Sequence, residues 1–302
     1  MNRKHTSILS HILLILLCIL IRLPGKKEVQ PPFAMFAAIA LMEVLYLIRV
    51  TRHREQLRAA SDLMVVLWGF LILWECAVTK LALMHPVLVP APENVFRVFV
   101  DDRKVIATGV FSSLRLFLSS MIAGLAAGMA AGLICGWIRR LRDVFHPIAS
   151  VLAPIPSTVF APYVVALMPT FRSASAVVLI LGIFWPTFLG MIVRIDGMDK
   201  GIMDSARAMN LSNASMILEI LFPYAFAGVV GSLKVTFTTG IMLLTFAEMM
   251  GATSGMGYYI VNYNTYGNYT KVVAGIIVVG TVVTVLNKCI DILQKKLIVW
   301  EM

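Results

Sequence analysis

Long apolar stretches separated by short basic segments constrain this sequence more than any other feature. Ala174–Val193 and Phe226–Phe246 each have the length that a helix needs to cross the hydrocarbon core of a bilayer, roughly 20 residues. Only 14% of the residues are charged, whereas a soluble domain carries about a quarter. The alternating ten-residue segments typical of a transmembrane barrel are missing from the sequence. The sequence therefore predicts an all-α, polytopic membrane protein.

The net charge of +10 comes from basic residues that lie beside the apolar stretches. Clusters stand at Arg49, Arg52, Arg54 and Arg58, at Arg139, Arg140 and Arg142, and at Lys288, Lys295 and Lys296. Under the positive-inside rule such clusters mark cytoplasmic segments, so we expect a plasma-membrane protein with both termini in the cytoplasm. The same pattern argues against a nucleic-acid partner. The four cysteines (Cys18, Cys76, Cys135 and Cys289) lack metal-ligand spacing and are interpreted as small buried thiols.

Residues 1–60 are predicted to form an N-terminal membrane extension of two helices. Ile8–Ile21 is apolar, but no small-residue cleavage site follows it, so we interpret it as an uncleaved and rather short membrane helix. Pro32–Ile48 is the second stretch. The basic residues between the two stretches would then face outward, against the positive-inside rule. A shallow re-entrant hairpin is the alternative, and the sequence leaves both open.

Residues 61–302 are predicted to form a core of six membrane helices. The stretches that define this core are Leu63–Leu83, Val105–Trp137, His146–Pro169, Ser173–Val193, Phe226–Met250 and Val272–Leu286. The third is rich in proline, including Pro154 and Pro156, and is therefore expected to be broken or kinked. Because broken backbone at membrane depth must be buried in protein or line a cavity, these two prolines are candidate pathway residues.

Two further patterns concern the packing of the core. Four glycines fall four residues apart and share one helical stripe: Gly124, Gly128, Gly132 and Gly136. Such a stripe lets a neighbouring helix approach closely, and we favour this interpretation over a lining of the pathway. Asn94–Val100, which follows Pro86, Pro90 and Pro92, is expected to form a short surface helix.

Gly197–Pro223 is the longest polar interlude in the second half of the chain. Within it, an apolar residue recurs at the spacing of one helix face, at Ile202, Met203, Ala206 and Met209. Asp199 can serve the N-terminal end of this helix, and Asn210 tolerates the left-handed conformation that a helix stop needs. Ser212 can then cap a second helix that runs toward Pro223. A short helix, a tight turn and a returning helix together predict a docking knob.

This segment resembles the cytoplasmic coupling motif of binding-protein-dependent ABC importer permeases. That motif reads E-A-A, three residues, G, about nine residues, and then an apolar residue and P. The matching residues here are Asp204, Ser205, Ala206, Arg207, Ala208, Met209 and Asn210, followed by Ile220, Leu221, Phe222 and Pro223. Asp204 stands where the family has Glu, and Asn210 stands where it has Gly. The resemblance implies that these residues couple the chain to an ATPase.

Other motifs resemble the nitrate, sulfonate and taurine branch of the same permeases. Leu88–Pro92 is similar to the L-P-S-P segment of that branch. Ala153–Pro156 and Ala161–Pro162 together are similar to its R-P-I-P-P…A-P segment. Phe246–Ala252 is similar to A-E-M-L-G-A, and Ser254–Tyr258 is similar to S-G-L-G-Y. Ala153 stands where that branch usually has Arg. The motifs fall in the expected order over about residues 61–302, and residues 1–60 lie outside the resemblance.

The resemblance implies the membrane-spanning subunit of an ABC importer. The chain has no GxxxxGK[ST] phosphate loop, so we expect no cofactor here and assign ATP and Mg to a separate ATPase subunit. The resemblance also implies an extracytoplasmic solute-binding protein and a second permease copy in a homodimer. The cargo of that branch comprises small anions such as nitrate and sulfonates, or thiamine-precursor-like organic solutes. The residues themselves do not identify the cargo.

An ion-coupled secondary transporter is the alternative function. It would need paired acidic residues at the middle of the membrane and internal repeats, whereas the membrane segments hold few acids beyond Glu43, Glu75 and Glu248. Glu248 is a candidate gate or orienting residue, expected to accept hydrogen bonds from loop amides in 251–257. Glu75 either faces a pathway or makes a buried hydrogen bond to a neighbouring helix. An intramembrane enzyme is disfavoured because HExxH and GxSxG are both missing from the sequence.

Overall fold

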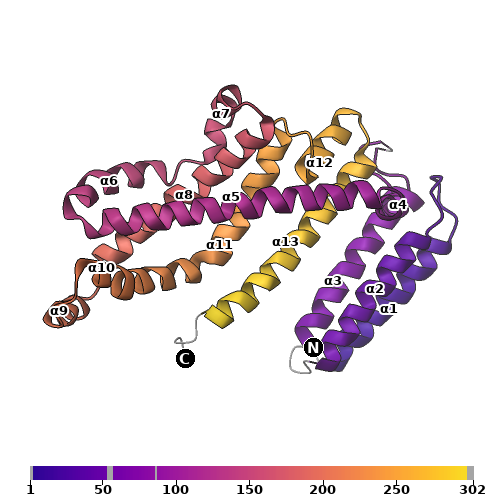
Figure 1. Ribbon diagram of the computed structural model, residues 1–302. Coiled ribbons are helices and arrows are strands. Elements are labelled where there is room, and N and C mark those ends of the chain that lie inside the picture. The colour runs from indigo at the N-terminus through magenta and orange to yellow at the C-terminus, as the bar shows by residue number, and fades with distance from the viewer. Residues whose placement is uncertain (1–2, 53–56, 86, 298–302) are drawn as a thin grey trace. The chain divides into compact units, whose positions relative to one another are not determined.

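The computed structural model describes residues 3–52, 57–85 and 87–297, and the regular elements in these ranges are all helical (Figure 1). Their bounds are α1 Arg3–Arg22, α2 Phe33–Arg52, α3 Leu57–Glu75, η2 Cys76–Lys80, α4 Pro92–Asp101, α5 Arg103–Trp137, α6 Arg139–Leu152, η3 Ser157–Phe160, α7 Ala161–Leu167, α8 Phe171–Asp196, α9 Lys200–Ala208, α10 Asn213–Ser215, η4 Met216–Leu221, α11 Phe222–Met249, α12 Met256–Thr265 and α13 Tyr269–Leu297. The elements η2 and η4 are π-helical, and η3 is a 3-10 turn. Arg54 and Pro86 lie outside the described residues.

Six of the described helices are long and apolar enough to span a membrane. They are Phe33–Arg52, Arg58–Lys80, Arg103–Trp137, Phe171–Asp196, Asn213–Met249 and Tyr269–Lys296. The proline-rich stretch supplies a seventh candidate, in which Arg139–Leu152 and Ser157–Leu167 are bent by 84° at the break between them. The predictions of an all-α polytopic protein and of a broken third core helix are therefore confirmed. The apolar part of α1, Thr6–Arg22, is shorter than the six spans, as expected for the first helix.

The chain divides into two compact units, Met1–Ala107 with Ile260–Val278 and Thr108–Tyr259 with Val279–Met302. In the first unit α1, α2 and α3 pack around Trp68 of α3, which is fully buried together with Leu17 of α1 and Met35 of α2. A polar contact also joins α1 to α2, since His11 Nδ1 lies 3.2 Å from Glu43 Oε1. Glu43 thus has a partner within the N-terminal hairpin.

The helix predicted at Asn94–Val100 is present as α4, but it is not a surface helix. Val95 and Val98 are buried against Ala274 of α13. Phe96 is buried in the cluster that α1, α2 and α3 form. Apolar residues three positions apart give α4 one buried face, and the sequence interpretation missed the partners that cover this face.

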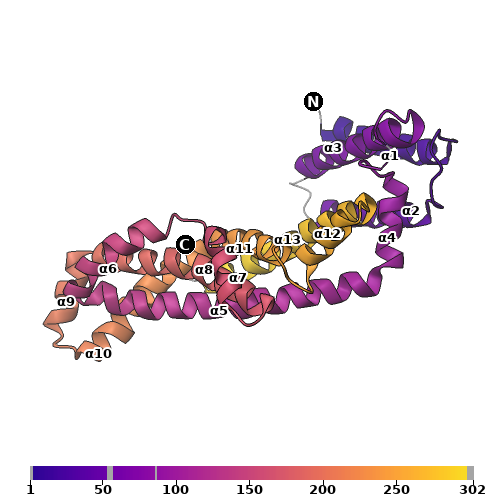
Figure 2. The same ribbon diagram turned by 90° about the horizontal axis from the view of Figure 1, so that it is seen from above.

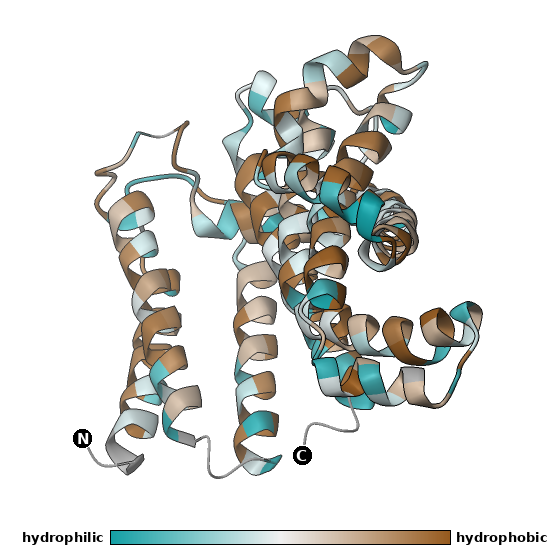
Figure 3. Ribbon diagram, turned by 90° about the vertical axis from the view of Figure 1, so that its left-hand side faces the viewer, coloured by the Kyte–Doolittle hydropathy of each residue, from teal (hydrophilic) through white to brown (hydrophobic). Residues whose placement is uncertain are grey.

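In the second unit α8 packs against α11 and against α6, which lies beside it (Figure 2). The glycine stripe of α5 faces α8, as predicted. A Cβ added at Gly132 would lie 2.5 Å from Met191 Cβ, and one added at Gly128 would lie 3.0 Å from the Phe184 carbonyl oxygen. The two helices therefore approach too closely for any residue with a side chain. Apolar residues run along the lengths of the helices, while hydrophilic residues gather mostly toward their ends (Figure 3).

Candidate functional site

The docking knob predicted from the sequence is present in the second unit. Asp199 Oδ1 accepts a hydrogen bond from the Gly201 amide at 2.6 Å and so caps the start of α9. Asn210 has φ +54°, the left-handed conformation that stops the helix. Ser212 Oγ then accepts a hydrogen bond from the Ser215 amide at 3.1 Å and caps α10. Each local signal in the sequence therefore has its expected geometry.

The apolar stripe of α9 divides into a buried face and an exposed face. Ala206 is 3% exposed and packs with Met203 against the core of the second unit. Ile202 is 44% exposed and Met209 is 71% exposed. The stripe is too wide for one contact, because its members span i, i+1, i+4 and i+7. Ala206 therefore packs the knob against this chain, whereas Ile202 and Met209 remain exposed.

The buried face of α9 is held by side chains from three other elements. Those side chains are Met191 and Ile195 of α8, Met216 and Leu221 of η4, and Ala225 of α11. Removing a side chain of the size of Met216 from water contributes roughly 1.5–3 kcal/mol. The knob therefore shares an apolar cluster with residues of the spanning helices α8 and α11.

The other motif residues lie on or near the exposed side of the knob. Asp204, Ser205 and Ala208 are exposed, whereas the side chain of Arg207 lies outside the described part of the structure. Pro223, expected near the end of the second helix, does not end it, because the helical path continues from Asn213 to Met249. The π-helical turn η4 precedes Pro223, and the Phe222 amide bonds to the Ile217 carbonyl. This wider turn accommodates a residue that has no amide to donate.

Two arginines, one of α6 and one near the end of α8, lie at the entry to the knob, and no sequence motif marked them. Arg142 Nη1 of α6 lies 2.7 Å from Asp196 Oδ1, the last residue of α8. Arg194 passes across Gly228 of α11 so closely that a Cβ there would overlap its guanidinium. The segment that enters α9 is thus tied to α6 and α11.

The break that contains Pro154 and Pro156 lies between α6 and η3, also in the second unit. Pro156 precedes the turn Ser157–Phe160, and the backbone amide of Ile155 bonds to the Leu152 carbonyl at 3.2 Å. Ser157 is 4% exposed and lies against Gly182 of α8. Pro154 and Pro156 are themselves exposed, so Ser157 beside them is covered by protein while the two prolines are not.

Glu248 of α11 is 1% exposed and forms a brace that joins three elements. Ser113 Oγ of α5 donates to its carboxylate, 2.7 Å from Oε1 and 2.9 Å from Oε2. The amide of Gly257, in the first turn of α12, donates to Oε2 at 2.9 Å, which is the loop hydrogen bond predicted for Glu248. The Met256 amide donates to Ser113 Oγ at 2.9 Å. The carboxylate therefore caps α12.

Gly255 makes this brace possible. Its φ is +113°, and a Cβ there would overlap the Glu248 carboxylate. Only glycine adopts this conformation without strain and also leaves room for the acid. Ser113 and Glu248 also line a mostly apolar cavity with Phe117, Ile241 and Thr245. The sequence offered no signal for Ser113, which is 135 positions from Glu248.

Glu75, the remaining candidate, lies in the first unit and is 0% exposed. Its Oε1 is 3.1 Å from Lys80 Nζ, and the Thr79 hydroxyl lies 3.4 Å from its Oε2. The structure therefore places it in a closed cluster of polar side chains. Among the residues that the structure describes, no group of three His, Cys, Asp or Glu side chains could hold a metal ion.

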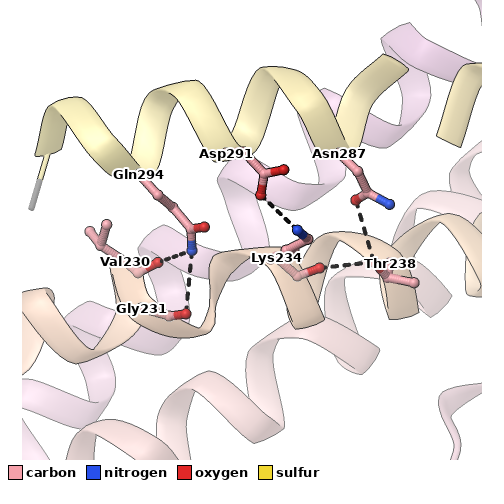
Figure 4. A network of polar contacts seen from close by, with 7 residues as sticks. All are labelled: Val230, Gly231, Lys234, Thr238, Asn287, Asp291 and Gln294. Carbon is pink, nitrogen blue, oxygen red and sulfur yellow. Dashed lines mark hydrogen bonds and ion pairs between the residues drawn. The ribbon is translucent and has the colours of Figure 1, made fainter. Parts of the chain in front are cut away.

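A polar seam joins α11 to α13 within the second unit (Figure 4). Lys234 Nζ lies 2.7 Å from Asp291 Oδ1, and Gln294 Nε2 donates to the Val230 and Gly231 carbonyls at 2.7 and 3.3 Å. Thr238 reaches Asn287 at 3.5 Å, a weak contact. Lys234 thus has an acidic partner on the neighbouring helix.

The chain is thus a multi-pass helical protein with a capped, half-buried helix between two candidate spanning helices. Residues 124–298 match the family described as "Binding-protein-dependent transport system inner membrane component", which covers more than half of the chain. The chain therefore belongs to this family. It is a permease component of an ABC importer, a multi-pass inner-membrane protein and not the ATPase subunit.

Individual relatives agree with this assignment. The taurine transport system permease protein TauC of Escherichia coli is 22% identical over 74% of this chain and 84% of its own length. The nitrate import permease protein NrtB of Leptolyngbya laminosa is 24% identical over 50% of this chain and 54% of its own length. Among solved structures, a chain of the inward-facing MetNI methionine ABC transporter superposes with a TM-score of 0.56 at 19% identity, covering 65% of this chain and 98% of that one. This structural similarity shows that the two chains share a fold.

Proposed function

We propose that this permease receives the force of ATP hydrolysis through α9 and imports a small anion of the sulfonate or nitrate kind. The main support for the coupling role is that α9 has one buried face and one exposed face. Met203 and Ala206 fix the helix to its own core, whereas Ile202 and Met209 remain exposed. An exposed apolar pair on a short, rigidly held helix suits insertion into an apolar groove of a partner.

The proposed partner at α9 is an ATPase subunit, and ATP and Mg act there rather than on this chain. Because Arg142, Asp196 and Arg194 tie the knob to α6, α8 and α11, a push on α9 reaches spanning helices directly. A solute-binding protein delivers the cargo from outside, and a second copy of the chain completes the pathway across the bilayer.

Two observations support an anionic cargo: the cargo for which relatives are named, and the charges of the spanning helices. TauC is named for taurine, a sulfonate, and NrtB for nitrate. Three acids of these helices already have partners within the chain: Glu43 with His11, Glu75 with Lys80, and Asp291 with Lys234. A fourth, Glu248, is held by Ser113 and the Gly257 amide. Acids engaged in this way repel an anion less than unpaired acids would.

Uptake into proteoliposomes that hold the permease, its ATPase and its binding protein tests this proposal. Labelled taurine and labelled nitrate are compared with a labelled organic cation, with and without Mg-ATP inside the vesicles. We expect uptake of at least one of the two anions, and only with Mg-ATP. Uptake of the cation alone would overturn the cargo class. Uptake driven by an ion gradient without the ATPase would instead support the secondary-transporter alternative.

A further inference from the structure

Two carboxyl groups lie buried together at the end of α3, outside the docking knob and the Glu248 brace. Glu75 is 0% exposed and Glu93, in the first turn of α4, is 1% exposed. One hydroxyl lies against both of them, because Thr79 Oγ1 is 3.4 Å from Glu75 Oε2 and 3.3 Å from Glu93 Oε2. That hydroxyl has a single proton to donate, so it satisfies one of the two acids at a time.

The charge of this cluster does not balance if both acids are ionised. Lys80 Nζ lies 3.1 Å from Glu75 Oε1, which pairs one carboxylate with one ammonium. Glu93 Oε1 is fully buried and accepts no hydrogen bond from the described residues. A second buried carboxylate beside a first one is strongly disfavoured unless it takes up a proton. Geometry and charge together therefore call for one proton on the pair.

The same cluster holds the loop that connects the two N-terminal helices. The amides of Lys26 and Lys27 donate to the Thr79 carbonyl at 3.0 and 3.4 Å, and Lys80 Nζ donates to the Leu23 carbonyl at 2.6 Å. A Cβ at Gly25 would lie 2.6 Å from that Thr79 oxygen, so the loop packs tightly against η2. The loop also reaches α4, since the Gln30 amide donates to Asn94 Oδ1 at 2.9 Å.

We propose that Glu75 and Glu93 form a proton-binding site, and that the bound proton latches the 23–30 loop onto η2 and α4. Loss of the proton leaves two buried carboxylates facing one ammonium. Exposure to water then lowers the free energy of the two carboxylates, so the cluster opens. Opening frees Thr79 and Lys80 from the loop. The charged groups of the cluster are Glu75 of α3, Lys80 of η2 and Glu93 of α4, and those of the latched loop are Lys26, Lys27 and Glu28.

The titration of Glu93 agrees with this geometry. Burial is the main cause that raises the pKa of Glu93 from 4.5 to about 7, and the nearby Glu75 raises it further, while its backbone hydrogen bond and Lys80 act in the opposite direction. An acid whose pKa is higher in the closed state stabilises that state at low pH. The stabilisation is complete below about 4.5 and is lost as the pH rises through about 7.

Hydrogen exchange at the Lys26 and Lys27 amides of the full-length permease in lipid nanodiscs tests the latch. Protection is corrected for the intrinsic effect of pH on exchange. Between about pH 5 and about pH 8, linkage predicts a fall in protection of up to about 100-fold. E93Q, which carries no charge at either pH, should keep the loop protected across the range. D101N on the same helix, where Asp101 is exposed and paired with Arg97, should behave as wild type.

Two outcomes would overturn the proposal. One is protection in the wild type that does not change with pH. The other is an E93Q protein that keeps the wild-type pH dependence. If E93Q does not fold, the infrared band of a buried carboxylic acid decides the matter, measured in E248Q so that the buried acid Glu248 cannot supply the band. We expect that band at about pH 5 and its loss by about pH 8. A band that is missing at the lower pH would contradict a proton on the pair.

Discussion

Ser113 of α5 and Glu248 of α11 lie 135 positions apart, yet the serine hydroxyl touches both carboxylate oxygens, at 2.7 and 2.9 Å. The amide of Gly257 is a second donor to the same acid. The acid thus joins α5, α11 and α12 at one point. We propose that Glu248 is an orienting residue that sets these elements relative to one another, because its oxygens are engaged by the protein itself.

Replacement of Glu248 by Gln should reduce the maximal uptake rate more than the apparent affinity for cargo. Glutamine keeps the shape, but its amide group cannot accept both hydrogen bonds, and one mispaired buried group costs about 1 kcal/mol. We expect the maximal rate to fall roughly fivefold, the ratio that corresponds to this energy. Uptake measured against cargo concentration checks this. A selective loss of apparent affinity would instead indicate direct contact with the cargo.

Substitution of Gly132 by Ala should destabilise the second unit. The added methyl carbon would lie 2.5 Å from Met191 Cβ and 2.9 Å from the Phe188 carbonyl oxygen, and neither can move without shifting α8. Overpacking of this kind costs about 1–3 kcal/mol. Thermal unfolding of the purified protein is the measurement. Gly280→Ala is the matched control, because nothing lies within 4 Å of a Cβ at Gly280. Equal melting temperatures for the two variants would contradict the close approach of α5 and α8.

At Asn210, Gly should be tolerated and Val should not. The left-handed backbone at φ +54° suits Gly and Asn, whereas a β-branched residue there is strained by about 1–2 kcal/mol. We expect Asn210→Gly to transport at the wild-type rate. Asn210→Val should loosen the turn after α9 and lower ATP-dependent uptake at equal protein level. Unchanged uptake with Val would show that the turn conformation is not needed for coupling.

Local signals in the sequence predicted the knob well. Asp199, Asn210 and Ser212 act through their own backbone neighbours, so the printed sequence contains all that their geometry needs. The glycine stripe of α5 was also readable, because a four-residue spacing has one structural meaning in a helix. The break at Pro154 and Pro156 follows in the same way from the chemistry of proline.

Features that depend on contacts between residues far apart in the sequence could not be predicted. Ala206 is buried because Met216 and Leu221 fold back against it, and its spacing alone could not separate that role from docking. The bond between Ser113 and Glu248 and the pairing of Glu75 with Glu93 both join residues from different helices. The second helix was predicted to run toward Pro223, but the π-helical turn that carries the helix past this proline has no sequence signature.

Retention of the ATPase subunit by an Ile202→Asp permease tests the central claim most directly. Ile202 is exposed, so the change should leave the fold intact, while the charge should keep the helix out of an apolar groove. Tyr266→Asp, at another exposed position, is the control. We predict that the ATPase copurifies with the wild type and the control, but that less than about a tenth remains with Ile202→Asp, a loss of about 1.4 kcal/mol or more in binding. Wild-type retention together with wild-type uptake by Ile202→Asp would contradict the docking role of α9.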